Sequence, residues 1–491
     1  MASTAQPLSI ALIGNGPQRR WQANFAGALR REGHSVVHAR EAPTAAARGV
    51  ELLLELERLA YGARSRAFAQ QDARDVAAAG KHDIIIDLRE RPITDAGAVT
   101  LVPLFDGAPG EAALIAALLD QRAPEVAVAR WCDELQVVAR GLPALENHNI
   151  LAHGLDQVLA RTADLLRQCV NRIARGDEIG GKSTSILQHK SPSLLSFGAK
   201  GLAAKLSERL TRLAMHPEHW RIAFRQLADD AVIEREKWAE TNWTRVPDDL
   251  QRYFADPFPF IENGRTYVFC EEYPYATRKG IISLFEIVDG RPTKPRPVLE
   301  RAYHLSYPFV FRRGANIYMI PETSSAGRIE LYRADPFPDR WTFERVLVDD
   351  VIASDATLVT WQGRDWLFAS IAGDGASTWD ALGLFHAAGL FDEWEPHPLN
   401  PVLIDAGTAR PGGAMMVVQD GRLRRVAQDC RERYGGGIVL ADVGELDADN
   451  YSQTVRTVLG SPAGSGALGV HTLNSAGEIE AIDLVGPLRR W

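Results

Sequence analysis

The 491-residue chain has few cysteines, no excess of positive charge and no long apolar run. Only 4 cysteines are present, and no two of them form a CxxC pair. The cysteines therefore provide no zinc motif, no metal site is predicted, and their spacing is typical of a reducing compartment. The formal net charge of −8 at pH 7 argues against a nucleic-acid partner, because phosphate binding requires a basic surface.

No stretch reaches the roughly 18 consecutive apolar residues that indicate a membrane-spanning helix, so no transmembrane segment is predicted. The N-terminal residues 1–16 lack a basic start region and are interpreted as a first β-strand, not as a signal peptide. A cytoplasmic protein is therefore the expectation. A chain of 491 residues with 46% hydrophobic and 24% charged residues predicts a globular protein of two or more domains.

The second half of the chain repeats one short pattern of strand, turn and strand. Residues 255–287 read as three strands with a turn at Asn263-Gly264, and Asn-Gly between apolar runs is a strong hairpin signal. Similar patterns begin at Ser306, Ser354, Gly412 and Leu468. A period of about fifty residues built from short antiparallel strands is typical of propeller blades, so the sequence predicts a five-bladed β-propeller. A β-sandwich is the alternative.

The repeats can be aligned on their turn glycines, which are Gly264, Gly314, Gly363, Gly421 and Gly477. Eight residues before these glycines lie Asp256, Ser306, Asp355, Gly413 and Gly469. Seven residues after three of the glycines lie Glu271, Ser370 and Gln428, whereas Glu322 lies eight residues after Gly314. The first strand of each propeller blade lines the central channel, so residues at shared positions are expected to converge there.

Residues 1–175 alternate strands with helices, which predicts a Rossmann-like α/β domain with a parallel sheet. Gly14 and Gly16 have the G-x-G spacing of a phosphate-binding turn, but no third glycine completes the motif. These two glycines are the candidate cofactor-binding residues, for a nucleotide or a sugar nucleotide at the start of the following helix. A tight strand-to-helix turn without a ligand is the alternative.

A linker with helices is predicted over residues 176–245, ahead of the propeller at 246–491. The segment 199–215 has the periodicity of an amphipathic helix. The segment 219–227, which contains Trp220 and Phe224, is predicted to continue as a second helix.

Three carboxylates at matching repeat positions are the candidate catalytic residues: Asp256, Asp355 and Glu322. A carboxylate in an apolar strand is costly unless it has a partner or a task. Glycosyl chemistry requires one carboxylic acid to assist the leaving oxygen and one ionised carboxylate as base or nucleophile. Crowding of like charges separates their pKa values and so makes both roles possible. The structural alternatives are a turn, a cap or a carboxylate paired with arginine.

Further polar residues in or near the repeats are candidate substrate contacts: Glu271, Arg410, Gln428, Asp429, Tyr434 and His471. Arg410 has the bidentate guanidinium that binds a carboxylate or phosphate. The glycines after Tyr434 allow a ligand or a backbone to approach closely. A surface arginine and a packed histidine are the alternatives for Arg410 and His471.

The repeats with acidic residues at their starts resemble the five-bladed propellers of the arabinanase, invertase and levansucrase group of glycoside hydrolases. In that group one aspartate opens the first blade, a second lies in a later blade, and a glutamate supplies the acid. The resemblance therefore implies these roles for Asp256, Asp355 and Glu322. The NDP and RDP motifs of the sucrose-acting branch are absent, so sucrose is not the expected substrate.

The segments DPFPFIENGRTYVFCEEY, KGIISLFEI and YMIPETSSAGRIELYRA resemble the N-terminal propeller domain of plant glucosamine inositolphosphorylceramide transferases and their bacterial relatives. This resemblance covers about residues 240–490. In the plant enzymes the transferase chemistry belongs to a separate C-terminal domain that has no counterpart in this sequence. Residues 1–175 resemble a formyltransferase only in their opening strand and helix, so no residue roles are transferred from that family.

The sequence therefore predicts a carbohydrate-active enzyme that transfers or hydrolyses a glycosidic bond through an acidic cluster in the propeller channel. Its partner would be a carbohydrate or glycoconjugate, and a nucleotide sugar is the candidate donor, although the cofactor stays open. One alternative is a non-catalytic sugar-binding protein of polysaccharide or glycolipid biosynthesis. The other is a formyltransferase-like enzyme with a propeller as accessory domain.

Overall fold

The computed structural model describes residues 6–41, 47–71, 81–93, 98–131, 134–187, 193–240 and 243–489. The chain divides into two compact units. The first unit contains residues 1–208 together with the short segment 373–377, and the second contains residues 209–372 and 378–491. Three of the four cysteines, Cys169, Cys270 and Cys430, are buried free thiols. Cys132 lies outside the described residues.

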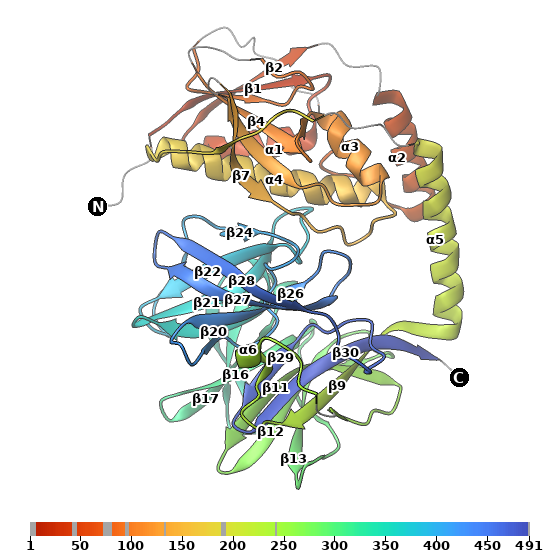
Figure 1. Ribbon diagram of the computed structural model, residues 1–491, viewed down its shortest axis with the longest axis vertical. Helices are drawn as coiled ribbons and strands as arrows, with labels where there is room; N and C mark the ends of the chain where they lie inside the picture. The colour runs from red at the N-terminus through yellow and green to blue at the C-terminus, as the bar shows by residue number, and fades with distance from the viewer. Residues whose placement is uncertain are drawn as a thin grey trace. The chain divides into compact units, whose positions relative to one another are not determined.

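The first unit is built on one mixed β-sheet (Figure 1). Its strands are β1 (Ser9–Asn15), β2 (Ser35–Glu41), β3 (Ile84–Asp87), β4 (Val99–Phe105), β5 (Ala108–Pro109), β6 (Val126–Trp131), β7 (Leu135–Gly141) and β8 (Lys182–Ser183). They pair in the order β2-β1-β3-β4-β6-β7-β8. The pairs from β2 to β4 are parallel, whereas β6, β7 and β8 continue the sheet in antiparallel pairs. The predicted all-parallel sheet is therefore correct only for the first four strands.

Among the described residues, four helices lie wholly in this unit: α1 (Arg20–Arg31), α2 (Ala47–Tyr61), α3 (Glu111–Leu119) and α4 (Leu151–Ala174). The long helix α4 contacts each of the other three, and its apolar stripe is buried through Leu155, Val158, Leu159, Leu165 and Leu166. This repeat of three and four residues is the period of an amphipathic helix. The turn between β1 and α1 contains Gly14 and Gly16, and Gly16 adopts a positive φ of 76°.

The second unit contains five separate antiparallel sheets, which confirms the predicted five-bladed propeller. The first sheet has β11 (Arg252–Glu262), β12 (Arg265–Pro274), β13 (Ile281–Val288), β14 (Arg291–Pro292) and β15 (Arg296–Leu299). The second has β16 (Ser306–Arg313), β17 (Asn316–Glu322), β18 (Ile329–Ala334) and β19 (Trp341–Val348), and a short 3-10 helix η1 (Ser324–Ala326) follows β17. The third has β20 (Ile352–Trp361), β21 (Arg364–Ala372), β22 (Ala381–Ala387), β23 (Glu395–Pro396) and β24 (Leu403–Ile404).

The fourth sheet has β25 (Met416–Val417), β26 (Leu423–Asp429), β27 (Gly437–Leu446) and β28 (Tyr451–Leu459). The fifth joins the two ends of the unit, since β9 (Met215–Gln226) pairs with both β10 (Thr244–Arg245) and β30 (Ile479–Arg489), and β30 also pairs with β29 (Leu473–Ala476). Figure 1 shows β9 and β30 side by side. Pairing of the first long strand with the last one closes the ring of blades.

The predicted helix over residues 219–227 is wrong, because this segment is part of strand β9. Trp220, Ile222 and Phe224 are all buried and alternate along the chain, which is the two-residue period of a strand. Their apolar character alone does not separate strand from helix. The predicted helix just before it is confirmed as α5 (Leu194–Ala214), and a short helix α6 (Val232–Arg235) follows β9.

The first three blades share a β-bulge in their opening strand. The residue in the bulge has a positive φ in each case: Asp256 at 52°, Tyr307 at 43° and Asp355 at 57°. Tyr307, and not the predicted Ser306, is therefore the blade-two equivalent of the two aspartates. The glycine alignment is one residue off in this blade, because Gly314 is the first residue of its hairpin turn whereas Gly264 is the second.

Candidate functional site

Side chains from all five sheets of the propeller form one buried polar cluster. Asp256 comes from β11, Glu271 from β12, Glu322 from β17 and Asp355 from β20. The fourth sheet contributes Gln428 on β26, and the fifth contributes Asp483 on β30. Arg410 and His471 reach the cluster from the loops before β25 and β29. All eight side chains are buried, although every one of them is polar.

The bulges place the acids in the cluster. Ala255 pairs with Glu271, Ser306 pairs with Glu322, and Ser354 pairs with Ser370, so the second-strand positions are equivalent in the three blades. A bulge aims a side chain away from the regular alternation of a strand. The left-handed backbone at Asp256 and Asp355 costs conformational energy for a non-glycine residue, and such strain is often retained at functional sites.

Asp256 is held by a histidine and by backbone and hydroxyl donors. His471 Nε2 lies 3.0 Å from its Oδ1, the Thr472 hydroxyl donates to the same oxygen over 2.9 Å, and the Tyr307 N–H donates to Oδ2 over 3.0 Å. Burial opposes the charge, but the His471 imidazolium and these hydrogen bonds hold the pKa of Asp256 below its ordinary value. Asp256 is therefore the ionised carboxylate of the cluster.

His471 lies between two carboxylates. Its Nδ1 is 2.9 Å from Asp483 Oδ2, and the Trp220 ring packs against the imidazole with 4.0 Å between ring centroids. Burial disfavours the imidazolium, but Asp483 and Asp256 outweigh it and raise the pKa of His471 to about 10. The ligand atoms of Asp256, His471 and Asp483 lie within 4.8 Å of one another, a spacing suited to a cation. A protonated His471 supplies the positive charge there instead.

Arg410 is shared by two further acids. Its Nε lies 2.7 Å from Asp355 Oδ2, and its Nη2 lies 3.5 Å from Glu322 Oε2. Gln428 Nε2 donates to the same Asp355 oxygen over 2.9 Å. One guanidinium neutralises only one carboxylate, and burial, with Glu322 and Asp256 nearby, raises the pKa of Asp355 well above its usual range. Burial and the neighbouring acids therefore favour the protonated form of Asp355.

Among the acids of the cluster, Glu271 has the least compensation of its negative charge by a neighbouring cation. His304 Nε2 lies 3.3 Å from Glu271 Oε1, but burial lowers the pKa of His304, which favours the neutral imidazole. Burial, followed by the nearby charge of Asp256, raises the pKa of Glu271 well above its usual range. A Cβ atom at Gly280 would lie only 2.7 Å from Glu271 Oε1, so the absence of a side chain at Gly280 makes room for this carboxyl group.

Two acid oxygens of the cluster receive no hydrogen bond from the described residues, namely Glu271 Oε1 and Glu322 Oε2. Buried polar atoms are normally paired, so each such atom calls for an explanation. Among the described residues, the five carboxylates of the cluster contact two cations, His471 and Arg410. The site therefore combines carboxyl groups whose pKa values are shifted in opposite directions with acceptor positions that a ligand can fill.

Half-buried aromatic rings lie next to this cluster. Tyr434 lies under the Arg410 guanidinium, with 5.0 Å from the guanidinium carbon to the ring centroid, and Trp379 is 5.6 Å from Tyr434. Tyr253 and Tyr273 stack with centroids 4.8 Å apart, and Tyr273 is 6.1 Å from the ring of His304. Tyr434, Trp379, Tyr253 and Tyr273 are each half-buried. Flat apolar rings beside hydrogen-bonding acids are suited to the two kinds of surface of a sugar ring.

The structure brings most of the predicted site residues together: Asp256, Asp355, Glu322, Glu271, Arg410, Gln428, Tyr434 and His471. Asp429 differs, because its carboxylate is bound by Arg431 over 2.6 Å. Sequence reasoning missed two contributors: Asp483 and Tyr253. A charge inside the apolar strand sequence EIEAIDLV was the available signal for Asp483.

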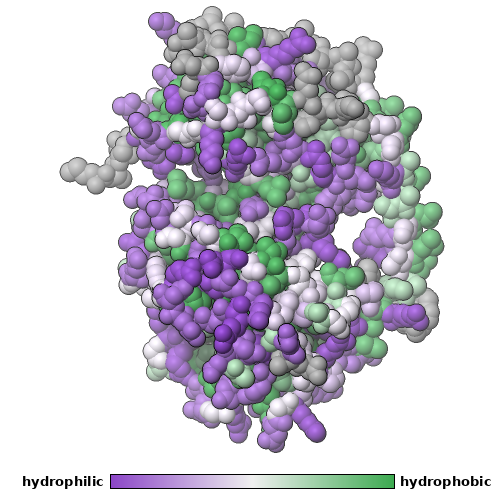
Figure 2. All heavy atoms as spheres, in the orientation of Figure 1, coloured by the Kyte–Doolittle hydropathy of each residue, from purple (hydrophilic) through white to green (hydrophobic). Residues whose placement is uncertain are grey.

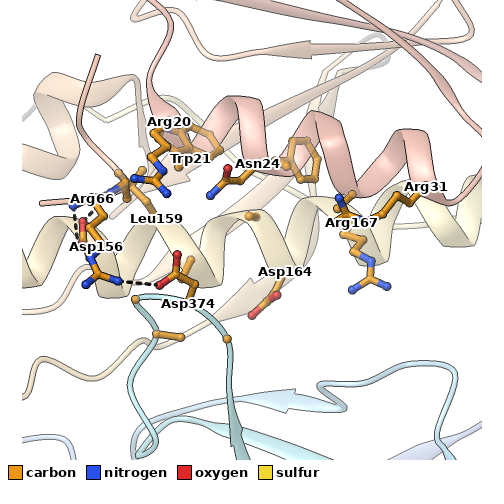
Figure 3. A pocket seen from close by; sticks show the side chains of 18 residues that line it. Arg20, Trp21, Asn24, Arg31, Arg66, Asp156, Leu159, Asp164, Arg167 and Asp374 are labelled. Atoms are coloured by element: carbon orange, nitrogen blue, oxygen red, sulfur yellow. Dashed lines mark hydrogen bonds and ion pairs between the residues drawn. The ribbon is translucent and has the colours of Figure 1, made fainter. Parts of the chain in front are cut away.

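A cavity with a volume of about 350 Å³ belongs to the first unit (Figure 3). Helices α1 and α4 line it with Arg20, Asn24, Arg31, Asp164 and Arg167. Its acids are already held, since Asp156 accepts from the Ser65 hydroxyl and two backbone N–H groups, and Asp164 pairs with Arg161. This cavity lacks the crowding of buried carboxylates that marks the propeller cluster.

The second unit is thus a five-bladed propeller with an acidic centre, and most of it is similar in sequence to known proteins. Residues 245–463 match the family model of the N-terminal region of glucosamine inositolphosphorylceramide transferase 1. The Arabidopsis thaliana protein of that name is 34% identical over 206 residues, which cover 41% of this chain and 27% of that protein. The Oryza sativa subsp. japonica protein is 32% identical over 205 residues, again 41% of this chain and 27% of the relative.

The match confirms the resemblance predicted for the propeller residues. The chain spans about a quarter of the length of these curated relatives. The family match starts at residue 245 and so does not bear on the formyltransferase resemblance, which stays a prediction.

Solved structures of glycoside hydrolases are distantly similar to this chain. They include Zg3597, a family 117 glycoside hydrolase of Zobellia galactanivorans, with a TM-score of 0.35 and 13% identity over 54% of this chain and 90% of that one. A second is the exo-β-1,3-galactanase 1,3Gal43A of Clostridium thermocellum, with a TM-score of 0.36 and 12% identity over 52% of this chain and 65% of that one. Likeness at this level says nothing about substrate. None of the described helices has the length and apolar character that a membrane span requires.

Proposed function

We propose that this protein is a carbohydrate-active enzyme that acts on a glycosidic bond through the acidic cluster of its propeller. The observation that carries this proposal is the coexistence of carboxyl groups with opposite pKa shifts in one buried site. Asp256 has a lowered pKa, whereas Asp355 and Glu271 have raised ones. Pairs of acids with separated pKa values are the arrangement that glycosyl chemistry uses.

In this proposal Asp256 is the base or nucleophile. It stays ionised because His471, the Thr472 hydroxyl and the Tyr307 N–H all stabilise its negative charge. His471 is thereby a positioning residue for Asp256 and acts on the substrate only through it. Asp483 completes the set by holding the other nitrogen of the imidazole.

Glu322 is the proposed acid that protonates the leaving oxygen. Its Oε2 receives no hydrogen bond from the described residues, and it shares Arg410 with Asp355, whose raised pKa keeps a proton in this part of the cluster. Glu271, also with an oxygen free of hydrogen bonds, is proposed to bind a sugar hydroxyl. The aromatic rings of Tyr434 and Trp379 would pack against the sugar ring.

The matched relatives are named as transferases, but the match covers only their N-terminal region, so product analysis has to decide between transfer and hydrolysis. A transferase needs an activated donor, and we propose a nucleotide sugar for this role. The turn at Gly14 and Gly16 before α1 is the proposed phosphate site, since glycines allow a ligand to approach the backbone closely. Loss of nucleotide-sugar binding in Gly16→Val, measured by calorimetry, supports this donor site, and unchanged binding contradicts it.

The test of the catalytic proposal is product formation from a panel of aryl glycosides and nucleotide sugars, followed by mass spectrometry. Asp355→Asn and Glu322→Gln are expected to lower turnover by about 10²–10⁴-fold, the range of general acid–base catalysis. Asp420→Asn is a matched control, because Asp420 is an exposed acid of the fourth blade that pairs with Arg422. Unchanged turnover in Asp355→Asn and Glu322→Gln contradicts the proposal.

A second candidate function is sugar recognition without turnover. The stacked rings and unpaired acid oxygens favour it equally, since they serve binding as well as catalysis. It predicts that the wild-type protein binds a sugar measurably but forms no product, and that Asp256→Asn binds as well as the wild type.

A further inference from the structure

Helix α5 has two apolar faces, and only one of them is covered. Phe197 is buried at 2% exposure, and Gly201 is buried beside it on the next turn. On the opposite side lie Leu195, Leu202, Leu206, Leu210 and Leu213, which are between 60% and 86% exposed. Their spacings of seven, four, four and three residues place them in one row along the helix. We call these five residues the leucine row.

The neighbouring helix α2 also exposes leucines. Lys205 of α5 lies over the ring of Tyr61 of α2, at 4.0 Å from the ring centroid, so the two helices are adjacent. Helix α2 exposes Leu52, Leu56 and Leu59 by 53% to 68%. Figure 2 shows hydrophobic residues along the length of α5. Single exposed leucines need no explanation, but contiguous rows mark an interaction surface.

The charge of α5 selects the kind of partner. The helix carries Lys200, Lys205, Arg209 and Arg212 against one acid, Glu208, in a chain whose net charge is −8. A basic helix with a continuous apolar row is the pattern of helices that lie in the plane of a membrane surface. Screening limits the repulsion from the rest of the protein, since charges beyond about 8 Å contribute little at physiological salt.

We propose that the leucine row of α5 binds to the surface of a lipid membrane with anionic headgroups. The leucines would enter the boundary between headgroups and acyl chains, while the lysines and arginines contact the negative headgroups. Such binding needs no membrane-spanning helix. It is independent of the chemistry in the propeller, so it can fail without affecting the proposed function, and the reverse also holds.

A second copy of this chain suits the surface less well. Two copies of α5 packed along their leucine rows would bring four cations of one helix close to four of the other, with a single acid on each. Like charges on adjacent helices are destabilising. An anionic surface complements these charges, whereas self-association opposes them.

Vesicle sedimentation tests the proposal with the full-length protein. Wild-type protein is expected to bind vesicles of phosphatidylcholine with added phosphatidylglycerol, and to bind less as salt is raised or when phosphatidylglycerol is omitted. The triple variant Leu202→Ser, Leu206→Ser, Leu213→Ser is expected to lose about tenfold or more in binding, because each change removes burial of apolar groups. The pair Lys200→Gln, Arg209→Gln should lower binding to anionic vesicles specifically.

The matched control is Leu468→Ser, since Leu468 is a 50% exposed leucine outside α5. It should bind vesicles as the wild type does, and all variants should keep the wild-type circular dichroism spectrum because the changed side chains are exposed. Equal binding by the triple variant and the wild type overturns the proposal. So does a wild type that ignores vesicles, or one that is a dimer by light scattering and becomes a monomer in the triple variant.

Discussion

Replacing Arg410 by methionine tests the charge balance of the acidic cluster. Arg410 is the cation that contacts both Asp355 and Glu322, at 2.7 and 3.5 Å, and its side chain is 6% exposed. Removing one partner of a buried ion pair costs about 3–5 kcal/mol, because the remaining charge has no compensation. Arg410→Met should therefore destabilise the propeller by about this amount at neutral pH.

The cost has a defined pH dependence. Asp355 and Glu322 lose their charge when protonated, so the difference between wild type and Arg410→Met should shrink as the pH falls towards the ordinary range of carboxyl groups. The double variant Arg410→Met, Asp355→Asn removes one of the two acids and should recover part of the loss, with a coupling energy of about 0.5–3 kcal/mol.

Urea unfolding followed by tryptophan fluorescence measures these values. Eight of the 11 tryptophans lie between residues 220 and 394, so the signal reports mainly on the propeller. A loss below about 1 kcal/mol in Arg410→Met, or a loss that grows as the pH falls, refutes the reasoning, because an exposed ion pair contributes no more than this.

Three further results are expected. The pKa of His471 is raised from 6.5 to about 10. The stability that its positive charge contributes is therefore fully present below pH 6.5 and is lost as the pH rises towards 10, at up to ~1.4 kcal/mol per pH unit. A free energy of unfolding that does not change across this window in urea titrations contradicts the ion pairs of His471 with Asp256 and Asp483. Gly280→Ala should destabilise by about 1–3 kcal/mol, because the new Cβ would lie 2.5 Å from the Leu305 carbonyl oxygen, while Gly460→Ala, with open space around it, should not. Turnover should fall on the acid side as Asp256 gains a proton and on the alkaline side as Asp355, beside the proposed acid Glu322, loses one, so a pH-independent rate argues against the roles proposed for this cluster.

Much of the fold could be predicted, because its signals are local. The strands Val99–Phe105 and Val126–Trp131, for example, coincide with largely apolar runs of the sequence. The number of blades followed from hairpin turns that recur at a constant spacing. The direction of β6 could not be predicted in this way, since an apolar run indicates a buried strand without showing whether its neighbour is parallel.

Site residues at repeated positions of the blades could be predicted, whereas the site residue on the strand that closes the ring could not. Asp256 and Asp355 were found because they occupy the same bulge in blades one and three. Asp483 could not be found from the repeat, because it lies 227 residues from Asp256 and on the strand that pairs with β9. Because the β9 segment was predicted as a helix, its pairing with β30 was not expected. Asp483, the partner of His471, lies on β30 and was therefore not predicted.

The turnover of Asp256→Asn, measured together with its sugar binding, tests the central claim most directly. Asn keeps the size of the side chain and removes the charge that His471, Thr472 and Tyr307 stabilise. Turnover is predicted to fall by about 10²-fold or more while sugar affinity stays within a few-fold of the wild type. Wild-type turnover in Asp256→Asn would contradict a catalytic role for the acidic cluster.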